Sequence, residues 1–85
     1  MSEQSFSFED LKRILVDRVG LPEDVVKDEP DLTFEDMGLD SLALVEIQLA
    51  MEQEYGFTVA DEDAERILNV GEAIGYVNER LAAQA

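Results

Sequence analysis

Apolar side chains recur at helical spacing in three stretches of this chain, and this periodicity constrains the fold more than any other feature. The first stretch carries Leu11, Ile14, Leu15 and Val19 on one side. Ser7, with Asp10 three residues later, forms a variant of the capping box and predicts where this helix begins. Gly20, followed by a leucine and a proline, predicts where it ends.

The second helix is expected to run from Asp40 or Ser41 to about Tyr55 and to end at Gly56. Its two rows of side chains are Leu42, Val45, Leu49 and Glu52, and Leu44, Gln48, Met51 and Tyr55. It is therefore apolar over more of its circumference than a two-layer surface helix needs. Two interpretations stay open: one row forms an exposed docking face ringed by acids, or both rows are buried.

The final helix is expected to begin after Asn69, with Glu72 at the reciprocal capping position. Its core stripe is Val70, Ala73, Ile74, Val77 and Leu81. Asp61 is expected to cap a short third helix over residues 62–68. The side chains expected to turn inward from that helix are Ala64, Ile67 and Leu68. Residues 57–59 read as a short extended link without a clear partner strand.

The segment from Pro22 to Leu39 is a long connection with one short helical turn at residues 23–26. Its apolar anchors are Leu32, Phe34, Met37 and Leu39, and its acids are Asp28, Glu29, Asp31, Glu35 and Asp36. We expect the anchors to fold the segment over the helices and the acids to face solvent. The fold class is therefore all-α, a small bundle of three main helices plus one short helix, with a long loop between the first and second helices. Residues 1–85 form one domain, and we expect fraying at about 1–5 and 82–85.

Charge excludes several classes of partner. The 21 acidic and 6 basic residues give a formal charge of −15, and no Lys or Arg occurs from Asp28 through Glu65. Nucleic acid and anionic membrane surfaces need basic residues, so neither is an expected partner, whereas basic protein surfaces are favoured. No apolar run approaches membrane-spanning length, and the polar start of the chain lacks a secretory signal, so we expect a cytoplasmic protein.

The stretch from Asp36 to Glu46 holds the candidate site at Ser41. Asp40 can cap the second helix, which places the Ser41 hydroxyl in the first turn, where the helix dipole favours negative charge. A phosphate esterified to this hydroxyl would be electrostatically favourable there. The chain has no histidine and no cysteine, so Ser41 has no ordinary activating base and the protein has no thiol of its own. Asp40, Ser41 and Leu42 alone favour no more than an ordinary capped helix.

The assembled pattern resembles the acyl carrier proteins over nearly the whole chain. The matching runs are Asp40-Ser41-Leu42, Val45-Glu46, Glu52-Gln53-Glu54-Tyr55 and residues 59–67, followed by the closing amphipathic helix. Residues 38–46 and 52–56 look most like the stand-alone carriers of bacterial type II polyketide synthases. Ala60 stands where many relatives have proline, which predicts a looser entry into the third helix.

The resemblance implies a carrier subunit, not a catalyst, in antibiotic or other polyketide biosynthesis. In that family the serine of the Asp-Ser-Leu motif carries 4′-phosphopantetheine, which a phosphopantetheinyl transferase donates from coenzyme A, and Ser41 matches this serine. The thiol of that group holds acyl or polyketide intermediates as thioesters. The implied partner-recognition residues are Asp36, Asp40, Leu42, Glu46, Leu49 and Glu52. They would bind basic docking surfaces of the transferase, a ketosynthase, an acyltransferase and other synthase enzymes, with the carrier as a monomer.

Three alternatives remain at this stage. A fatty acyl or aminoacyl carrier would have the same fold, and a non-carrier acidic helical adaptor would use Ser41 only as part of a helix start. A calcium module is the third, because Asp61, Asp63, Glu65 and Glu72 match acidic positions of an EF-hand loop. Arg66 occupies the place of the required turn glycine, so we expect no metal site. The identity and length of the cargo, and a priming or elongation role, do not follow from the sequence.

Overall fold

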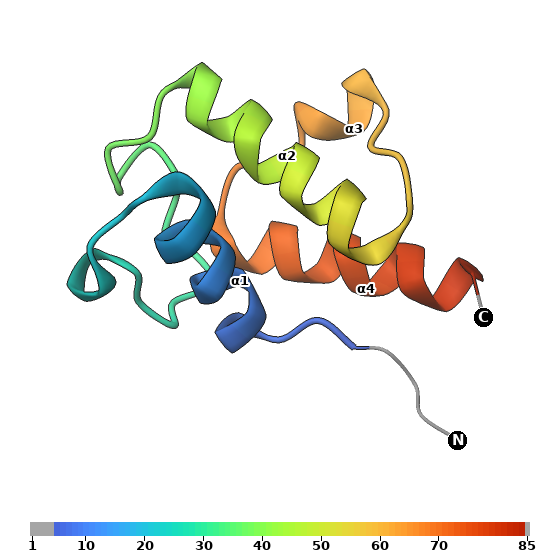
Figure 1. Cartoon of the computed structure of the whole chain (residues 1–85), viewed down its shortest axis with the longest axis horizontal. Helices are drawn as coiled ribbons and strands as arrows, with labels where there is room; N and C mark the ends of the chain where they lie inside the picture. Colours follow the sequence, from blue (N-terminus) through green and yellow to red (C-terminus); the bar gives the residue numbers. More distant parts are fainter. Residues whose placement is uncertain (1–4, 85) are drawn as a thin grey trace.

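Four α-helices pack together in the computed structural model, which describes residues 5–84 (Figure 1). In Figure 1, α2 crosses the view diagonally between α1 and α3, and α4 runs below α2 toward the C-terminus at the right. The helix bounds are α1 Phe8–Ile14, α2 Ser41–Tyr55, α3 Asp61–Ala64 and α4 Val70–Gln84. The predicted all-α bundle of three main helices and one short helix, with a long first loop, is confirmed.

The first helix begins at the predicted capping box. The Ser7 hydroxyl accepts the Asp10 N–H at 3.4 Å, and the Asp10 carboxylate accepts the Ser7 N–H at 3.0 Å. The π-helical turn η1 (Leu15–Val19) follows α1 directly and ends at Gly20, whose φ of 91° is readily adopted by glycine. We expected one regular helix up to this glycine, and the structure instead widens its last turn.

The long connection lies against the chain that leads from α3 into α4, through paired backbone groups. Phe34 N–H donates to the Leu68 carbonyl at 3.1 Å, and Val70 N–H donates to the Leu32 carbonyl at 3.0 Å. Gly71 N–H donates to the Pro30 carbonyl at 3.0 Å. We call residues 30–34 and 68–71 the paired segments. They fix one side of the long loop relative to the start of α4.

The rest of the loop follows its predicted pattern. The turn η2 (Glu23–Val25) lies where a short helical turn was expected. Phe34 and Met37 are buried, while Leu32 and Leu39 are half-buried. The five acids named above as a solvated face, from position 28 to position 36, are all exposed. The loop therefore packs its apolar side chains against the rest of the domain and exposes its acidic side chains to solvent.

The core draws side chains from every main helix and from the loop. Its largest fully buried members are Phe34, Leu11, Ile14, Leu15, Ile47, Met51, Val70 and Val77. The predicted stripe of α4 is confirmed except that Ile74 is only half-buried, and Tyr76, absent from that stripe, is buried. Tyr76 is buried because its ring packs against Phe57 and its hydroxyl bonds to a carboxylate of α3.

The third helix differs most from expectation. It spans only Asp61–Ala64, so Asp61 is its first residue, and the preceding Ala60 makes no side-chain capping bond. Leu68 was expected to turn inward but is 53% exposed. Leu68 lies beyond the end of α3, and its carbonyl accepts the Phe34 N–H of the long loop.

Both ends of the chain were expected to fray. Residues 1–4 and 85 lie outside the described residues. Helix α4 continues through Gln84, and fraying at residues 82–84 stays a prediction. Asn69 caps α4 as predicted, since its side-chain oxygen accepts the Glu72 N–H at 2.8 Å, whereas the Glu72 carboxylate accepts the N–H of Leu68 in place of that of Asn69.

Candidate functional site

Ser41 is the first residue of α2 and is exposed. Gly38, with φ of 85°, turns the chain just before it, and the Asp40 carboxylate accepts the Ala43 N–H at 2.9 Å. Asp40 is thus the N-cap, as expected. No described residue forms a hydrogen bond with the Ser41 hydroxyl, so the oxygen is available to an incoming reactant.

A groove of about 430 Å³ opens beside this hydroxyl. Its lining residues are Thr33, Phe34, Glu35, Leu39, Asp40, Ser41, Leu44 and Leu68. Apolar side chains from the loop, from α2 and from the segment before α4 therefore line a space that begins at the serine. The groove was not predicted as a site, because it forms only when the paired segments bring Leu68 to the start of α2.

The charged side chains at the mouth of the groove are acidic, and only the N-terminus of α2 contributes partial positive charge there. Asp40 and Glu35 line the groove and Asp36 lies exposed close by in sequence, while no basic residue occurs between positions 28 and 65. The unpaired N–H groups and the dipole of α2 offset part of the repulsion that a bound phosphate would meet. The same acids favour partners that bring basic side chains.

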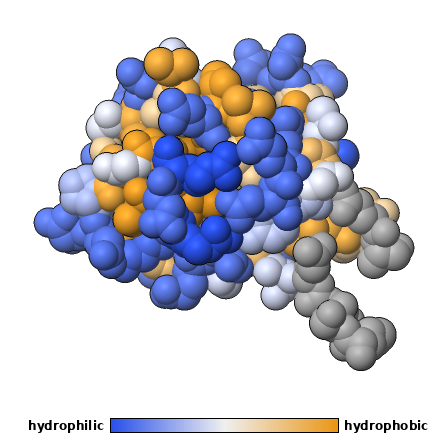
Figure 2. Space-filling model, viewed as in Figure 1, coloured by the Kyte–Doolittle hydropathy of each residue, from blue (hydrophilic) through white to orange (hydrophobic). Residues whose placement is uncertain are grey.

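One row of α2 is exposed and the opposite side enters the core. Leu42 is 68% exposed, and Val45 and Leu49 are each 47% exposed. Ile47, Ala50 and Met51 are buried. Figure 2 shows hydrophobic surface along its upper edge, over the N-terminal part of α2. Of the two open interpretations, the structure therefore favours an exposed apolar row, which we call the α2 face (Leu42, Val45, Leu49).

The predicted partner-recognition acids are not all equally free. Asp36, Asp40 and Glu46 are exposed. Glu52 is half-buried, and its carboxylate accepts the Val59 N–H at 2.7 Å. The structure thus places Glu46 beside the α2 face as a free acid and gives Glu52 a bond inside the molecule.

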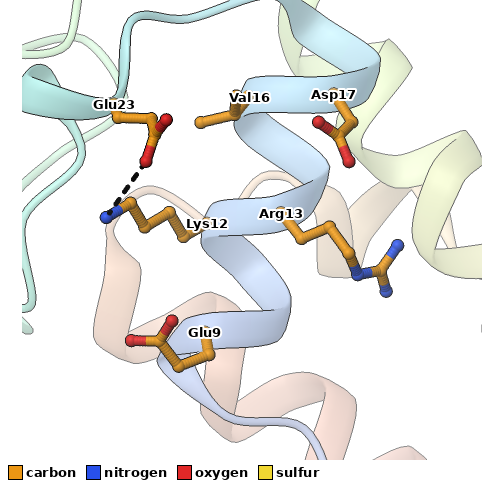
Figure 3. A pocket seen from close by; sticks show the side chains of 6 residues that line it. All are labelled: Glu9, Lys12, Arg13, Val16, Asp17 and Glu23. Atoms are coloured by element: carbon orange, nitrogen blue, oxygen red, sulfur yellow. Dashed lines mark ion pairs between the residues drawn. The ribbon is translucent and has the colours of Figure 1, made fainter.

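Basic side chains gather on the first helical segment, away from Ser41. A cavity of about 260 Å³ lies between this segment and η2, and Figure 3 shows the side chains that line it: Glu9, Lys12, Arg13, Val16, Asp17 and Glu23. Lys12 and Glu23 lie 4.0 Å apart, and Arg13 and Arg18 both contact Glu54, at 2.7 and 3.4 Å. The hydrogen bond and charge of Glu54 raise the pKa of Arg13 above its ordinary value. This surface carries paired charges of both signs.

Two of the four acids considered for a calcium loop, Asp63 and Glu72, have partners within the molecule. Asp63 accepts the Tyr76 hydroxyl at 3.0 Å and pairs with Arg66 at 3.3 Å, and Glu72 accepts the Leu68 N–H at 3.2 Å. Within the part of the chain that the structure describes, no cluster of three or more acidic, His or Cys side chains is arranged to hold a metal ion. Hydrogen bonds within the molecule account for the carboxylates of Asp63 and Glu72.

Comparison with known proteins assigns the family. Residues 9–77 match the family model described as a phosphopantetheine attachment site. The acyl carrier protein of Nitratidesulfovibrio vulgaris strain DP4 is 43% identical over 72 residues, which cover 85% of this chain and 93% of that protein. The chain belongs to the acyl carrier protein family. Members of this family carry acyl intermediates on covalently attached phosphopantetheine.

Solved acyl carrier protein structures have the same fold over the whole length. The octanoyl form from the actinorhodin polyketide synthase of Streptomyces coelicolor superposes with a TM-score of 0.85 at 36% identity, covering 99% of this chain and 100% of that one. The holo form of the actinorhodin carrier gives 0.79 at 36% identity with the same coverage. The resemblance read from the sequence motifs is thereby confirmed.

The residues of this acyl carrier protein fit the prosthetic group of its family. The group needs an accessible hydroxyl for its phosphodiester, and Ser41 is exposed at a helix N-terminus. The adjoining groove, with apolar walls formed by Phe34, Leu39 and Leu44, leaves room beside that hydroxyl. None of the helices within residues 5–84 combines the length and apolar character needed to cross a bilayer.

Proposed function

We propose that Ser41 is the attachment residue for 4′-phosphopantetheine in this carrier. In the transfer, the Ser41 oxygen bonds to the phosphorus that bears the pantetheine arm of coenzyme A. The bond from that phosphorus to the adenosine 3′,5′-bisphosphate breaks, and the serine proton passes to a base of the transferase. The single observation that carries this proposal is the exposed Ser41 hydroxyl at the start of α2, beside the groove.

The attached group supplies the thiol that the chain lacks and holds acyl groups there as thioesters. The protein contributes the tether and the recognition surface and catalyses no step itself. Asp40 fixes the backbone that presents Ser41, through its bond to the Ala43 N–H. The N-terminal amides of α2 stabilise the added phosphate.

Type II polyketide biosynthesis is the pathway best supported. The solved structures from the actinorhodin polyketide synthase match at 32–36% identity and cover this chain nearly end to end. Residues 38–46 and 52–56 resemble the same class of stand-alone carriers. A fatty acid carrier is the second candidate, because the N. vulgaris relative is named only as an acyl carrier protein and is 43% identical.

The α2 face and its surrounding acids form the proposed docking surface. Leu42 and Leu49 offer exposed apolar area, and Asp36, Asp40 and Glu46 offer exposed negative charge. This combination suits a phosphopantetheinyl transferase, a ketosynthase and an acyltransferase with basic rims around an apolar centre. Exposed charges speed association more than they slow dissociation, which suits a cytoplasmic, monomeric carrier that visits several enzymes in turn.

Intact-mass measurement tests the attachment residue. We expect a gain equal to one phosphopantetheine group when the protein is incubated with coenzyme A and a broad-specificity phosphopantetheinyl transferase. Ser41→Ala should show no gain. Ser7→Ala is the matched control, because Ser7 is another exposed serine at a helix start, and this variant should gain the full mass. Modification of folded Ser41→Ala would refute the assignment.

The pathway is tested with the loaded protein. Phosphopantetheinylated carrier should support product formation by a type II polyketide ketosynthase and acyltransferase at a higher rate than chain elongation by a bacterial fatty acid synthase. The reverse order of rates would assign the carrier to fatty acid biosynthesis and overturn the polyketide proposal while leaving Ser41 in place.

A further inference from the structure

Glu52 joins the α2 face to the segment that leads into α3. It lies one helical turn after Leu49, and its carboxylate accepts the Val59 N–H at 2.7 Å. The Val59 side chain is buried, with 7% exposure, so its amide is in a place where an unpaired donor would be costly. The bond therefore fixes the backbone two residues before α3 begins.

The third helix depends on such bonds from other elements. It has four residues, and Ala60 gives it no side-chain cap. Its second polar attachment is the Tyr76 hydroxyl bond to Asp63 at 3.0 Å. A helix this short is unstable by itself, so its position is set by contacts with α2 and α4.

No cation inside the described residues competes for Glu52. The ion pairs of this part of the chain involve Glu23, Glu54 and Asp63, and the span from Asp28 through Glu65 has no Lys or Arg. Glu52 is half-buried, so part of its surface remains within reach of a docked protein. A basic side chain that reaches it would form a pair in which both groups are charged, whereas in the bond to the Val59 amide only the carboxylate is charged.

We propose that Glu52 is a positioning residue that couples docking on the α2 face to the position of α3. In the free carrier its carboxylate holds Val59 against α2. In the complex, an Arg or Lys side chain of the partner binds the Glu52 carboxylate in place of the Val59 N–H. The hydrogen bond to Val59 is then broken, and residues 57–64 move away from α2. The effect on the free protein is independent of the proposed function, whereas release by a partner rests on it.

Amide hydrogen exchange in the isolated protein tests the first half. Relative to Val77, a buried residue of α4 that reports global stability, the Val59 amide should exchange roughly tenfold faster in Glu52→Ala than in the wild type. Glu52→Gln retains an acceptor oxygen and should exchange at nearly the wild-type rate. Glu46→Gln is the matched control, since it removes an exposed charge from the same helix without removing the bond. An unchanged Val59 rate in Glu52→Ala would overturn the proposal.

The second half uses the unmodified carrier and a phosphopantetheinyl transferase without coenzyme A. Binding should raise Val59 exchange in the wild type toward the rate of free Glu52→Ala, and it should leave the rate unchanged in Glu52→Gln, which offers no charge to the partner. Equal or greater protection of Val59 in the wild-type complex would refute the coupling. Adding coenzyme A and recording the mass then reports separately on Ser41, so a failed coupling is distinguishable from a failed carrier assignment.

Discussion

Asp40 and Ser41 are adjacent residues with different roles: Asp40 caps α2, and Ser41 presents an exposed hydroxyl. Asp40 takes the capping bond from the Ala43 N–H, which leaves the Ser41 hydroxyl without an intramolecular partner among the described residues. If a serine occupied the N-cap position itself, its hydroxyl oxygen would accept a backbone N–H of the first turn, as the Ser7 hydroxyl does at α1. The order Asp-Ser therefore keeps the helix stable and the nucleophilic oxygen free.

The Tyr76 side chain should make the free energy of unfolding depend on pH in the alkaline range. Burial, and then the bond to Asp63, raise the pKa of its hydroxyl above the ordinary 10.0. Because the folded state favours the protonated form, the free energy of unfolding is unaffected well below that pH and falls as pH rises through the folded pKa. Tyr76→Phe should lose about 1 kcal/mol near neutral pH but decline less between about pH 9 and about pH 11.

Urea unfolding across that pH range measures both effects. Burial also raises the pKa of Tyr55, so some alkaline loss should persist in Tyr76→Phe and should shrink further when Tyr55→Phe is added. An alkaline decline in Tyr76→Phe as steep as in the wild type would show that Tyr76 does not contribute.

At the scale of elements, helix ends were the most predictable part of the fold. Capping at Ser7, Asp40 and Asn69 is encoded in a few neighbouring residues, as are the glycine ends at positions 20 and 56. The position of Ser41, exposed at the start of α2, was predictable for the same reason. Helix-end rules could not give the exposed position of Leu68, because it depends on backbone pairing with a distant segment. Nor could they give the bond from Glu52, because it depends on how the chain after α2 folds back against that helix.

Because the long loop packs on the start of α4, Gly71 and Gly75 differ in the space available for a larger side chain. A Cβ at Gly71 would lie 3.0 Å from the Pro30 Cβ and 3.2 Å from its carbonyl oxygen, whereas one at Gly75 would meet nothing within 4 Å. Gly71→Ala should destabilise the fold by about 1–3 kcal/mol, and Gly75→Ala should stabilise it by about 0.5–1 kcal/mol. Chemical denaturation measures both, and equal effects of one sign would contradict the close approach of Pro30 to α4.

The two sides of α2 should also respond differently. Leu42→Ala removes an exposed side chain and should change stability by less than about 0.5 kcal/mol, whereas Ile47→Ala opens a cavity and should cost about 2–5 kcal/mol. On the proposed function, Leu42→Ala should nevertheless slow phosphopantetheinylation. Wild-type modification kinetics in Leu42→Ala would remove this residue from the docking surface.

At the scale of the whole molecule, the acidic excess opposes compactness. A formal charge of −15 on 85 residues produces self-repulsion that salt screens and mild acid reduces. The melting temperature should therefore rise between dilute buffer and moderate salt. Calorimetry at two ionic strengths checks this, and a lower melting temperature in salt would mean that attractive pairs such as Arg13 with Glu54 outweigh the repulsion.

The proposed function of this carrier depends most on where the prosthetic group is attached. Because no Lys or Arg lies between Lys27 and Arg66, trypsin releases residues 28–66 as one peptide, in which Ser41 is the only serine. After reaction with coenzyme A and a phosphopantetheinyl transferase, fragmentation of this peptide should place the added mass on Ser41. Finding the mass on any other residue, or on no residue of a folded and competent sample, would contradict the central claim.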